Sequence, residues 1–344
     1  MLGFLGEERE AYVLNLQRIA FAVLLFLLTL KMGQLVVQVA YFGDVFHMPL
    51  VPESWVPSRS VYWLMLGLQA LGCGLALFNV RARPALLVAA SLGLYGVLCN
   101  RLEYHNNRYE LLLLAFLVAL TPCDRQGKAP WWAVRLVGAQ VSLVYLASSL
   151  GKLFDADWRG GAVLLRRFGN GIPFFDHHGL HALTPILGSP TFAHAASLAA
   201  IASELFLALG LWFGRTRALA LWLGFMFHAG IEIAAHVELF SYTMIAGYIA
   251  FVTPELRERA VSWNIATLRG QRWAAFCRRL DLLARFQHQT STTQQPLVLV
   301  TDRSGTQHAG VPAWRELARA FPPLFPLWLP LTLFTLRRPR TPKA

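Results

Sequence analysis

Stretches of about 20 mainly apolar residues recur along this chain, and an α-helix needs about that length to cross the hydrocarbon core of a membrane. A backbone in lipid has to satisfy its own hydrogen bonds, so such stretches fold as helices. The expected fold class is therefore an all-α, polytopic integral membrane helical bundle of about eight spans. The candidate spans are Ile19–Ala40, Val61–Val80, Ala85–Asn100, Tyr109–Thr121, Ala133–Leu150, Phe192–Phe213, Ala218–His236 and Phe240–Val252.

The composition excludes two other classes of protein. Hydrophobic residues make up 56% of the chain and charged residues 15%, whereas soluble domains have about 45–50% and about 25%. A soluble enzyme with a single core is excluded, and so is a secreted domain held together by disulfides. The cysteines have neither metal-site nor disulfide-framework spacing; they are Cys73, Cys99, Cys123 and Cys277.

The net charge of +12 predicts membrane orientation better than nucleic-acid binding, because basic residues beside membrane spans gather on the cytoplasmic side. With eight spans, the basic loops around Arg81, Lys128 and Arg215 fall on the same side as the N-terminus. The basic region after the last span falls on that side too. We therefore expect a cell inner membrane protein with its N- and C-termini in the cytoplasm, and no nucleic-acid partner.

The region 255–344 forms a small appendage to the membrane domain 1–254. Arginines and aromatic residues alternate between Arg257 and Arg285, which favours a cationic amphipathic helix on the membrane surface over RNA or DNA binding. Beyond it, Leu297–Val300 resembles a strand and Trp314–Phe321 a helix.

Ionisable residues inside apolar spans are costly, so each one is a hypothesis for a functional site. Lys31 lies in the first span with Gln34 and Gln38 at helical spacing, which predicts a shared inward face; snorkelling of the lysine is the alternative. Glu204 marks the sixth span. His228 and Glu232 lie one turn apart on the seventh span, an arrangement that favours function over simple packing.

Two polar segments are richer in candidate residues. The first, Arg101–Glu110, lies between two apolar spans. The second, Val144–Gly161, carries Lys152 at the end of a span. Burial at a helix end favours the neutral amine of Lys152, which would then serve as a base. The alternative is a salt bridge from Lys152 to Asp155 or Asp157 that keeps the lysine charged.

Three motifs in this order resemble the HTTM (horizontally transferred transmembrane) domain family, whose best-known member is vitamin K-dependent gamma-carboxylase. The resemblance covers about Arg18 to Pro254. The first motif comprises Tyr145, Lys152, Leu153, Asp155, Ala156, Asp157, Trp158 and Gly161. The second comprises Asn106, Asn107 and Arg108, followed by the Leu113–Phe116 run. The third comprises Phe227, His228, Phe240, Ser241, Tyr242 and Met244.

The resemblance implies a carboxylase-like membrane enzyme, of the lyase class, in which Lys152 deprotonates a reduced quinone such as vitamin K hydroquinone. His228 would join Lys152 as a catalytic residue. Residues implied to bind the quinone are Asn106, Asn107, Arg108, Asp155, Asp157, Trp158 and Tyr242. Lys152 is expected to face a pocket bounded by Asn106, Arg108 and His228.

A second hypothesis stays open, because Arg108 occupies the position of a family histidine and an arginine is neither a neutral donor nor a base at neutral pH. The same fold would then be a non-catalytic scaffold that binds a membrane lipid or a quinone. The sequence identifies no protein partner.

The appendage resembles a DCC-type thioredoxin-like domain, which often follows an HTTM domain and carries a C-x-x-C pair on a helix. Here Ala274 occupies the first cysteine position and Cys277 the second. A single cysteine cannot cycle between dithiol and disulfide within its own site. The resemblance therefore implies a degenerate remnant.

Overall fold

The computed structural model describes residues 7–122, 127–169, 171–172, 175, 177–234, 237–252, 257–292 and 296–337. The chain forms two compact units. The membrane unit comprises Met1–Trp212 and Phe227–Val252, and the C-terminal unit comprises Phe213–Met226 and Thr253–Ala344. The expected boundary at residues 254 and 255 and Cys123 both lie outside the described residues.

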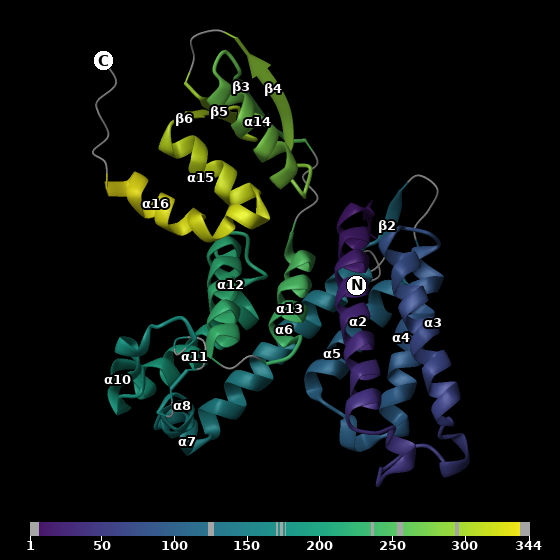
Figure 1. The fold of residues 1–344 in the computed structure, drawn as a ribbon. Helices are drawn as coiled ribbons and strands as arrows, with labels where there is room; N and C mark the ends of the chain where they lie inside the picture. Colours follow the sequence, from purple (N-terminus) through teal and green to yellow (C-terminus); the bar gives the residue numbers. More distant parts are fainter. Residues whose placement is uncertain are drawn as a thin grey trace. The chain divides into compact units, whose positions relative to one another are not determined.

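Long helices build the membrane unit, as the sequence predicts, and the all-α fold class is confirmed. Figure 1 shows α2 to α5 side by side, and α6 also packs on α11. These helices are α2 (Tyr12–Gln38), α3 (Arg59–Leu77), α4 (Ala82–Cys99), α5 (Asn106–Leu120), α6 (Trp132–Phe154), α11 (Pro190–Gly210), α12 (Arg217–Ala234), which the two units share, and α13 (Phe240–Gly247).

Six of the eight expected spans are long and apolar enough to cross a membrane within the described residues. The other two are helices that are too short. The 15 residues of α5 extend about 22 Å, and the eight of α13 with the four of η5 (Tyr248–Phe251) extend about 20 Å, against about 30 Å of hydrocarbon. The expected spans at these two places, Tyr109–Thr121 and Phe240–Val252, were already short, and the polar residues Asn106–Arg108 lie inside the first turn of α5.

Short elements connect the long helices of the membrane unit. Ser58 and Ser189 accept hydrogen bonds from backbone N–H groups in the first turns of α3 and α11, which are ordinary helix caps. The short helices are α7 (Ala156–Arg159), α8 (Ala162–Phe168) and α10 (Thr184–Leu187), and the 3₁₀ turns are η1 (Phe42–Asp44), η2 (Glu53–Trp55), η3 (Arg101–Glu103), η4 (His181–Leu183) and η5 (Tyr248–Phe251).

The N-terminal segment is held at one end of the membrane unit. Strand β1 (Glu8–Glu10) pairs antiparallel with β2 (Lys128–Pro130) in the link between α5 and α6. Arg135 also forms an ion pair with Glu7. The segment just before α2 and the link at Lys128 therefore lie at the same end of the bundle.

The C-terminal unit contains a four-stranded sheet with helices packed against it. Strand β3 pairs in parallel with β4 and antiparallel with β5, which pairs antiparallel with β6, so the order is β4-β3-β5-β6. The elements are β3 (Arg259–Asn264), α14 (Leu268–Leu280), β4 (Phe286–Ser291), β5 (Val298–Thr301), β6 (Gln307–Ala309), α15 (Val311–Ala320), η6 (Pro322–Leu327) and α16 (Trp328–Arg337). The expected strand at Leu297–Val300 and the helix at Trp314–Phe321 correspond to β5 and α15.

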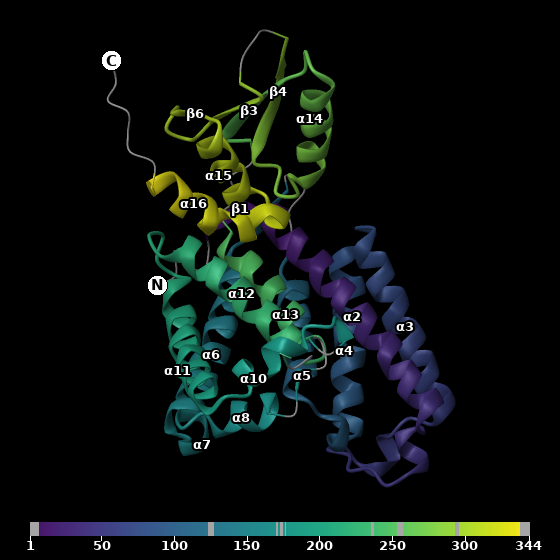
Figure 2. The ribbon, with the colours of Figure 1, turned by 60° about the vertical axis from the view of Figure 1, so that its left-hand side comes forward.

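The basic segment Arg257–Arg285 does not form the single amphipathic helix that the sequence suggested. It begins with β3, continues into α14 and ends just before β4 (Figure 2). Alternate residues of β3 are buried, among them Val261 and Trp263, and this period of two belongs to a strand with one covered face. Gly270 lets α14 begin close to β3, because a Cβ there would lie 1.6 Å from the Asn264 carbonyl oxygen.

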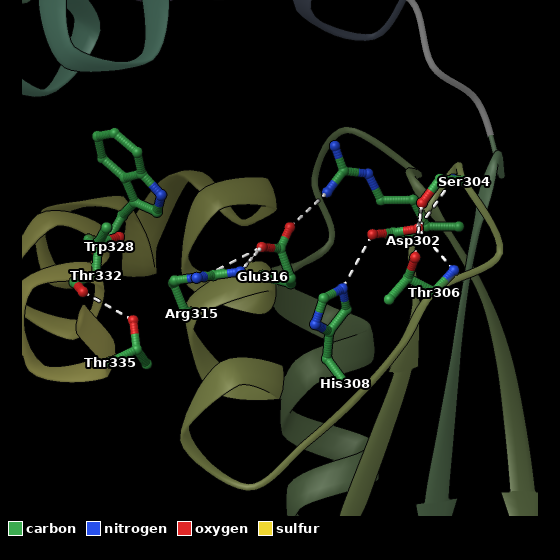
Figure 3. Close-up of polar contacts among 10 residues, drawn as sticks. Asp302, Ser304, Thr306, His308, Arg315, Glu316, Trp328, Thr332 and Thr335 are labelled. Atoms are coloured by element: carbon green, nitrogen blue, oxygen red, sulfur yellow. Dashed lines mark hydrogen bonds and ion pairs between the residues drawn. The ribbon is translucent and has the colours of Figure 1, made fainter. Parts of the chain in front are cut away.

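Helices α14 and α15 cover the same face of the sheet. The rings of Trp273 on α14 and Trp314 on α15 pack edge to face, 4.9 Å between centroids, above the buried Trp263. Asp302 closes the turn between β5 and β6 by accepting hydrogen bonds from Ser304, Thr306 and His308 (Figure 3).

Candidate functional site

The Lys152 motif folds as a helix end followed by a tight reversal. Helix α6 ends at Phe154. The Asp155 carboxylate then accepts hydrogen bonds from the backbone N–H groups of Asp157 and Trp158 and so caps the start of α7. Gly161 has a φ of +79°, and a Cβ there would lie 2.6 Å from the backbone of His194. Only glycine fits both conditions, so Asp155 and Gly161 serve to fold the chain back onto α11.

The reversal places Trp158 beside Lys152 and leaves the lysine facing α11. Lys152 Nζ donates to Ser148 Oγ at 2.7 Å and to Glu204 Oε1 and Oε2 at 2.6 and 2.7 Å. It also lies 4.9 Å from the centre of the Trp158 ring, a cation–π distance. The two charged side chains are largely buried, with exposed fractions of 17% for Lys152 and 6% for Glu204.

The alternative considered from the sequence, a salt bridge from Lys152 to Asp155 or Asp157, is wrong. Asp155 is occupied as a helix cap, and Asp157 pairs with Arg166 at 2.7 Å on the exposed surface. The carboxylate that pairs with Lys152 is Glu204, 52 residues further along the chain. The sequence carried a signal for it, since Glu204 is the one acidic residue within α11.

A second polar cluster lies along the same face of α6. Tyr145, Ser148 and Lys152 follow the spacing i, i+3, i+7, which places them on one side of a helix. The Tyr145 hydroxyl bonds His228 Nε2 at 2.6 Å and also contacts the Tyr248 hydroxyl. His228 is fully buried, and its Nδ1 has no hydrogen-bond partner among the described residues. Sequence reasoning missed Tyr248, whose only signal was its position in an apolar run.

Arg108 belongs to a third cluster. Its guanidinium donates to Glu238 Oε2 at 3.3 Å through Nε and to Oε1 at 3.0 Å through Nη2. Lys31 donates to the same Glu238 Oε1 at 2.5 Å. These two cations lower the pKa of Glu238 to about 2. Lys31 thus pairs across the bundle instead of snorkelling, but Gln34 and Gln38 are exposed, so the predicted shared inward face is wrong.

Lys152, Arg108 and His228 therefore have different direct partners, although Tyr145, which bonds His228, lies on the same face of α6 as Lys152. Asn106 is exposed at the start of α5, and Tyr242 is 49% exposed on α13. Asn107 is buried, and its Nδ2 has no hydrogen-bond partner among the described residues.

A small cavity of about 40 Å³ lies between α2, α3, α4 and α5, room for a few water molecules. Its polar lining comes from Gln69 and Arg108, and Gly93 and Gly96 lie on its wall. Gln69 is 5% exposed.

The described part of the chain offers little support for a reactive cysteine or a metal-binding site. Cys73, Cys99 and Cys277 are buried free thiols, and the described residues contain no cluster of three or more His, Cys, Asp or Glu side chains able to hold a metal. Burial raises the pKa of Cys277 to about 12. Cys277 lies near the C-terminal end of α14, whereas a helix N-terminus is what activates a thiolate.

The family of the chain follows from comparison with known proteins. No curated protein and no solved structure matches the chain. The model of the HTTM domain matches residues 7–256, which include each helix from α2 to α13 and all three polar clusters. The chain therefore belongs to the HTTM domain family.

Proposed function

We propose that this HTTM-family protein is a carboxylase-like membrane enzyme that removes a proton from the hydroxyl of a lipid-soluble quinol. The Lys152–Glu204 pair is the proposed proton site. The observation that carries the proposal is a buried, fully hydrogen-bonded ion pair at the end of a membrane span, because such a pair is costly to place in a membrane. A quinol such as vitamin K hydroquinone, when bound, supplies the acidic hydroxyl.

The side chains around Lys152 fit such a group. Trp158 offers an aromatic face beside the charge, and Ser148 and Glu204 offer hydrogen-bonding oxygen atoms. Leu153 is 41% exposed and Leu205 is 40% exposed on the two helices that carry the pair, so an apolar ligand reaches the site from the lipid side.

The contacts of Lys152 and Glu204 assign the proton acceptor differently from the sequence prediction, in which Lys152 was the base. A lysine ammonium has three donors and no acceptor, and Lys152 uses all three on Ser148 and Glu204. The proton acceptor in this arrangement is therefore the Glu204 carboxylate. Lys152 acts as the base only after passing its own proton to Glu204. By either route the pair ends with an ammonium and a carboxylic acid, and the ammonium balances the negative charge left on the ligand.

An indicator phenol tests this proton transfer directly. A lipophilic 4-nitrophenol, added to the full-length protein at a pH where the free probe is un-ionised, should show the absorbance of its ionised form when bound. Glu204→Gln should bind the probe without ionising it, and Lys152→Arg should retain ionisation because it keeps the positive charge. Glu110→Gln is the matched control, since Glu110 is another buried carboxylate of the bundle and bonds Gln140. Ionisation by Glu204→Gln equal to that by the wild type would exclude the proton site.

A non-catalytic scaffold that binds lipid or quinone is the second candidate function. Arg108 favours it, because this always-charged residue stands where the family has a histidine and is held by Glu238. The same probe separates the two functions. Binding to the wild-type protein without any ionisation would favour the scaffold.

We also propose that the C-terminal unit is a degenerate thioredoxin-like domain. The support is its topology, a βαβ unit followed by an antiparallel strand pair and a helix, with the order β4-β3-β5-β6. The residues at the N-terminus of α14 are not cysteines; Thr267 caps this helix by accepting from the Gly270 N–H. Cys277→Ser should accordingly leave expression and membrane function near wild type, and a large loss of function at normal expression would contradict the assignment.

We propose an inner membrane location with both termini in the cytoplasm. The pairing of β1 with the basic β2 segment supports it, because both then lie on the positive side. Cysteines placed at Glu53 and Gly160 should react with a membrane-impermeant thiol reagent in intact cells. One placed at Lys128 should not, and the reverse pattern would invert the orientation.

A further inference from the structure

The segment Pro322–Leu336, which comprises η6 and most of α16, exposes an apolar face that a water-soluble domain would hide. None of its 15 residues is charged. Leu327, Leu333 and Leu336 are 53%, 53% and 75% exposed, and Phe334 is 48% exposed. Leu327, Pro330 and Phe334 are exposed at the spacing i, i+3, i+7, so they form one continuous stripe.

The few polar side chains of this segment are turned back onto its own backbone. Thr332 Oγ1 donates to the Trp328 carbonyl oxygen at 2.7 Å, and Thr335 Oγ1 donates to that of Thr332 at 2.7 Å (Figure 3). Such bonds satisfy a hydroxyl group where no water is present. The two threonine hydroxyls of α16 therefore need no aqueous hydrogen-bond partner.

A hydrogen bond fixes the depth of this segment along α12, within the C-terminal unit. The indole N–H of Trp222 donates to the Pro326 carbonyl oxygen at 2.9 Å. Helix α12 has 18 residues, or about 27 Å, so its whole length is needed to cross about 30 Å of hydrocarbon. Trp222 lies five residues after Arg217, which places it about 7.5 Å inside the end of the span.

We propose that Pro322–Leu336 is an interfacial membrane segment whose binding partner is the lipid bilayer. Its apolar stripe contacts acyl chains just below the headgroups, at the depth of Trp222. Helix α16 extends about 15 Å, half of the hydrocarbon thickness, so it lies in the membrane without crossing it. The chain continues with Arg337, Arg338, Arg340 and Lys343, whose charge suits anionic lipid headgroups.

Single-cysteine labelling of the full-length protein in lipid nanodiscs tests the proposal. In a background without the native cysteines, a fluorophore is attached at Leu333→Cys or Phe334→Cys. Quenchers carried on lipid acyl chains are then compared with aqueous iodide. Leu268→Cys on α14 is the control for water exposure, because Leu268 is a 63% exposed leucine of the same unit. Leu71→Cys on α3, 57% exposed, is the control for lipid contact.

The expected result is that labels at Leu333 and Phe334 are quenched by the lipid-borne quencher within about twofold of the label at Leu71, and are protected from iodide. A label quenched by iodide as strongly as that at Leu268 would overturn the proposal. So would protection from both quenchers, because the segment would then be covered by protein, for example a second copy of the chain. Neither readout depends on the proposed proton chemistry.

Discussion

Two clusters of charge in the membrane unit, one largely buried and one partly exposed, differ in their balance of cations and anions. Lys152 and Glu204 form a one-to-one pair between α6 and α11. Glu238 instead holds two cations, Lys31 and Arg108, and Arg108 stays charged at any accessible pH. Both members of the first pair can become neutral by exchanging one proton, whereas the second cluster keeps its arginine charge. This difference is the reason why we propose proton transfer at the Lys152 pair, and a role in joining helices for the Glu238 cluster.

The largest expected effect is on the stability of the one-to-one pair. Glu204→Leu leaves the Lys152 ammonium without its anion in a largely buried position, which should cost about 3–5 kcal/mol of unfolding free energy. Chemical denaturation in mild detergent measures the loss. The double variant Lys152→Met with Glu204→Leu should recover most of it, because an apolar pair replaces the ion pair. A double variant as unstable as the single one would show that packing at Glu204, not charge, holds the helices together.

The next effect is on the pH dependence of the Glu238 cluster. Because the pKa of Glu238 in the folded protein is about 2, below its usual value of 4.5, the stabilisation is complete above about pH 4.5. It is lost as the pH falls from there towards 2. The melting temperature of the wild type should fall over this window, and Glu238→Gln should flatten that part of the curve. Identical slopes for the two proteins would mean that Glu238 is not the group that titrates.

The smallest effect is expected at Ser148, which accepts the third hydrogen bond of the Lys152 ammonium. Ser148→Ala should lower the free energy of unfolding by about 0.5–1.5 kcal/mol, the usual contribution of one hydrogen bond. Ser142→Ala is a matched control on the same helix, since Ser142 bonds Trp212 and not Lys152. If Ser148→Ala reduces ionisation of the indicator phenol no more than Ser142→Ala does, then Ser148 is not part of the proton site.

The helices of the membrane unit could be read from apolar stretches, because the cost of an unpaired backbone in lipid leaves few other solutions. The two short helices were also visible in the sequence, since the expected spans Tyr109–Thr121 and Phe240–Val252 are close in length to α5 and to α13 with η5. The C-terminal unit was harder to predict. Its β3 and α14 were merged into one basic helix, because surface arginines masked the alternation of buried residues in the strand.

In the candidate site, too, the sequence indicated a single residue but not its partner. Lys152 could be found from its sequence neighbours, but its partner Glu204 lies on another helix, and only the packing of α6 on α11 brings the two together. Asp155 and Asp157 looked like closer partners because they are near in the sequence. The reversal at α7 instead directs Asp155 to the backbone and Asp157 to Arg166.

The sequence by itself determined that this chain is a helical membrane protein and which ionisable residues its spans contain, because the hydrophobic effect and the need for backbone hydrogen bonds act on local runs of residues. Tertiary structure alone decided which charges meet. An ion pair depends on distances of 2.5–3.3 Å between side chains that are 52 to 207 positions apart, and such distances follow from helix packing. For this reason Lys152, Arg108 and His228, which the sequence grouped in one pocket, have different direct partners.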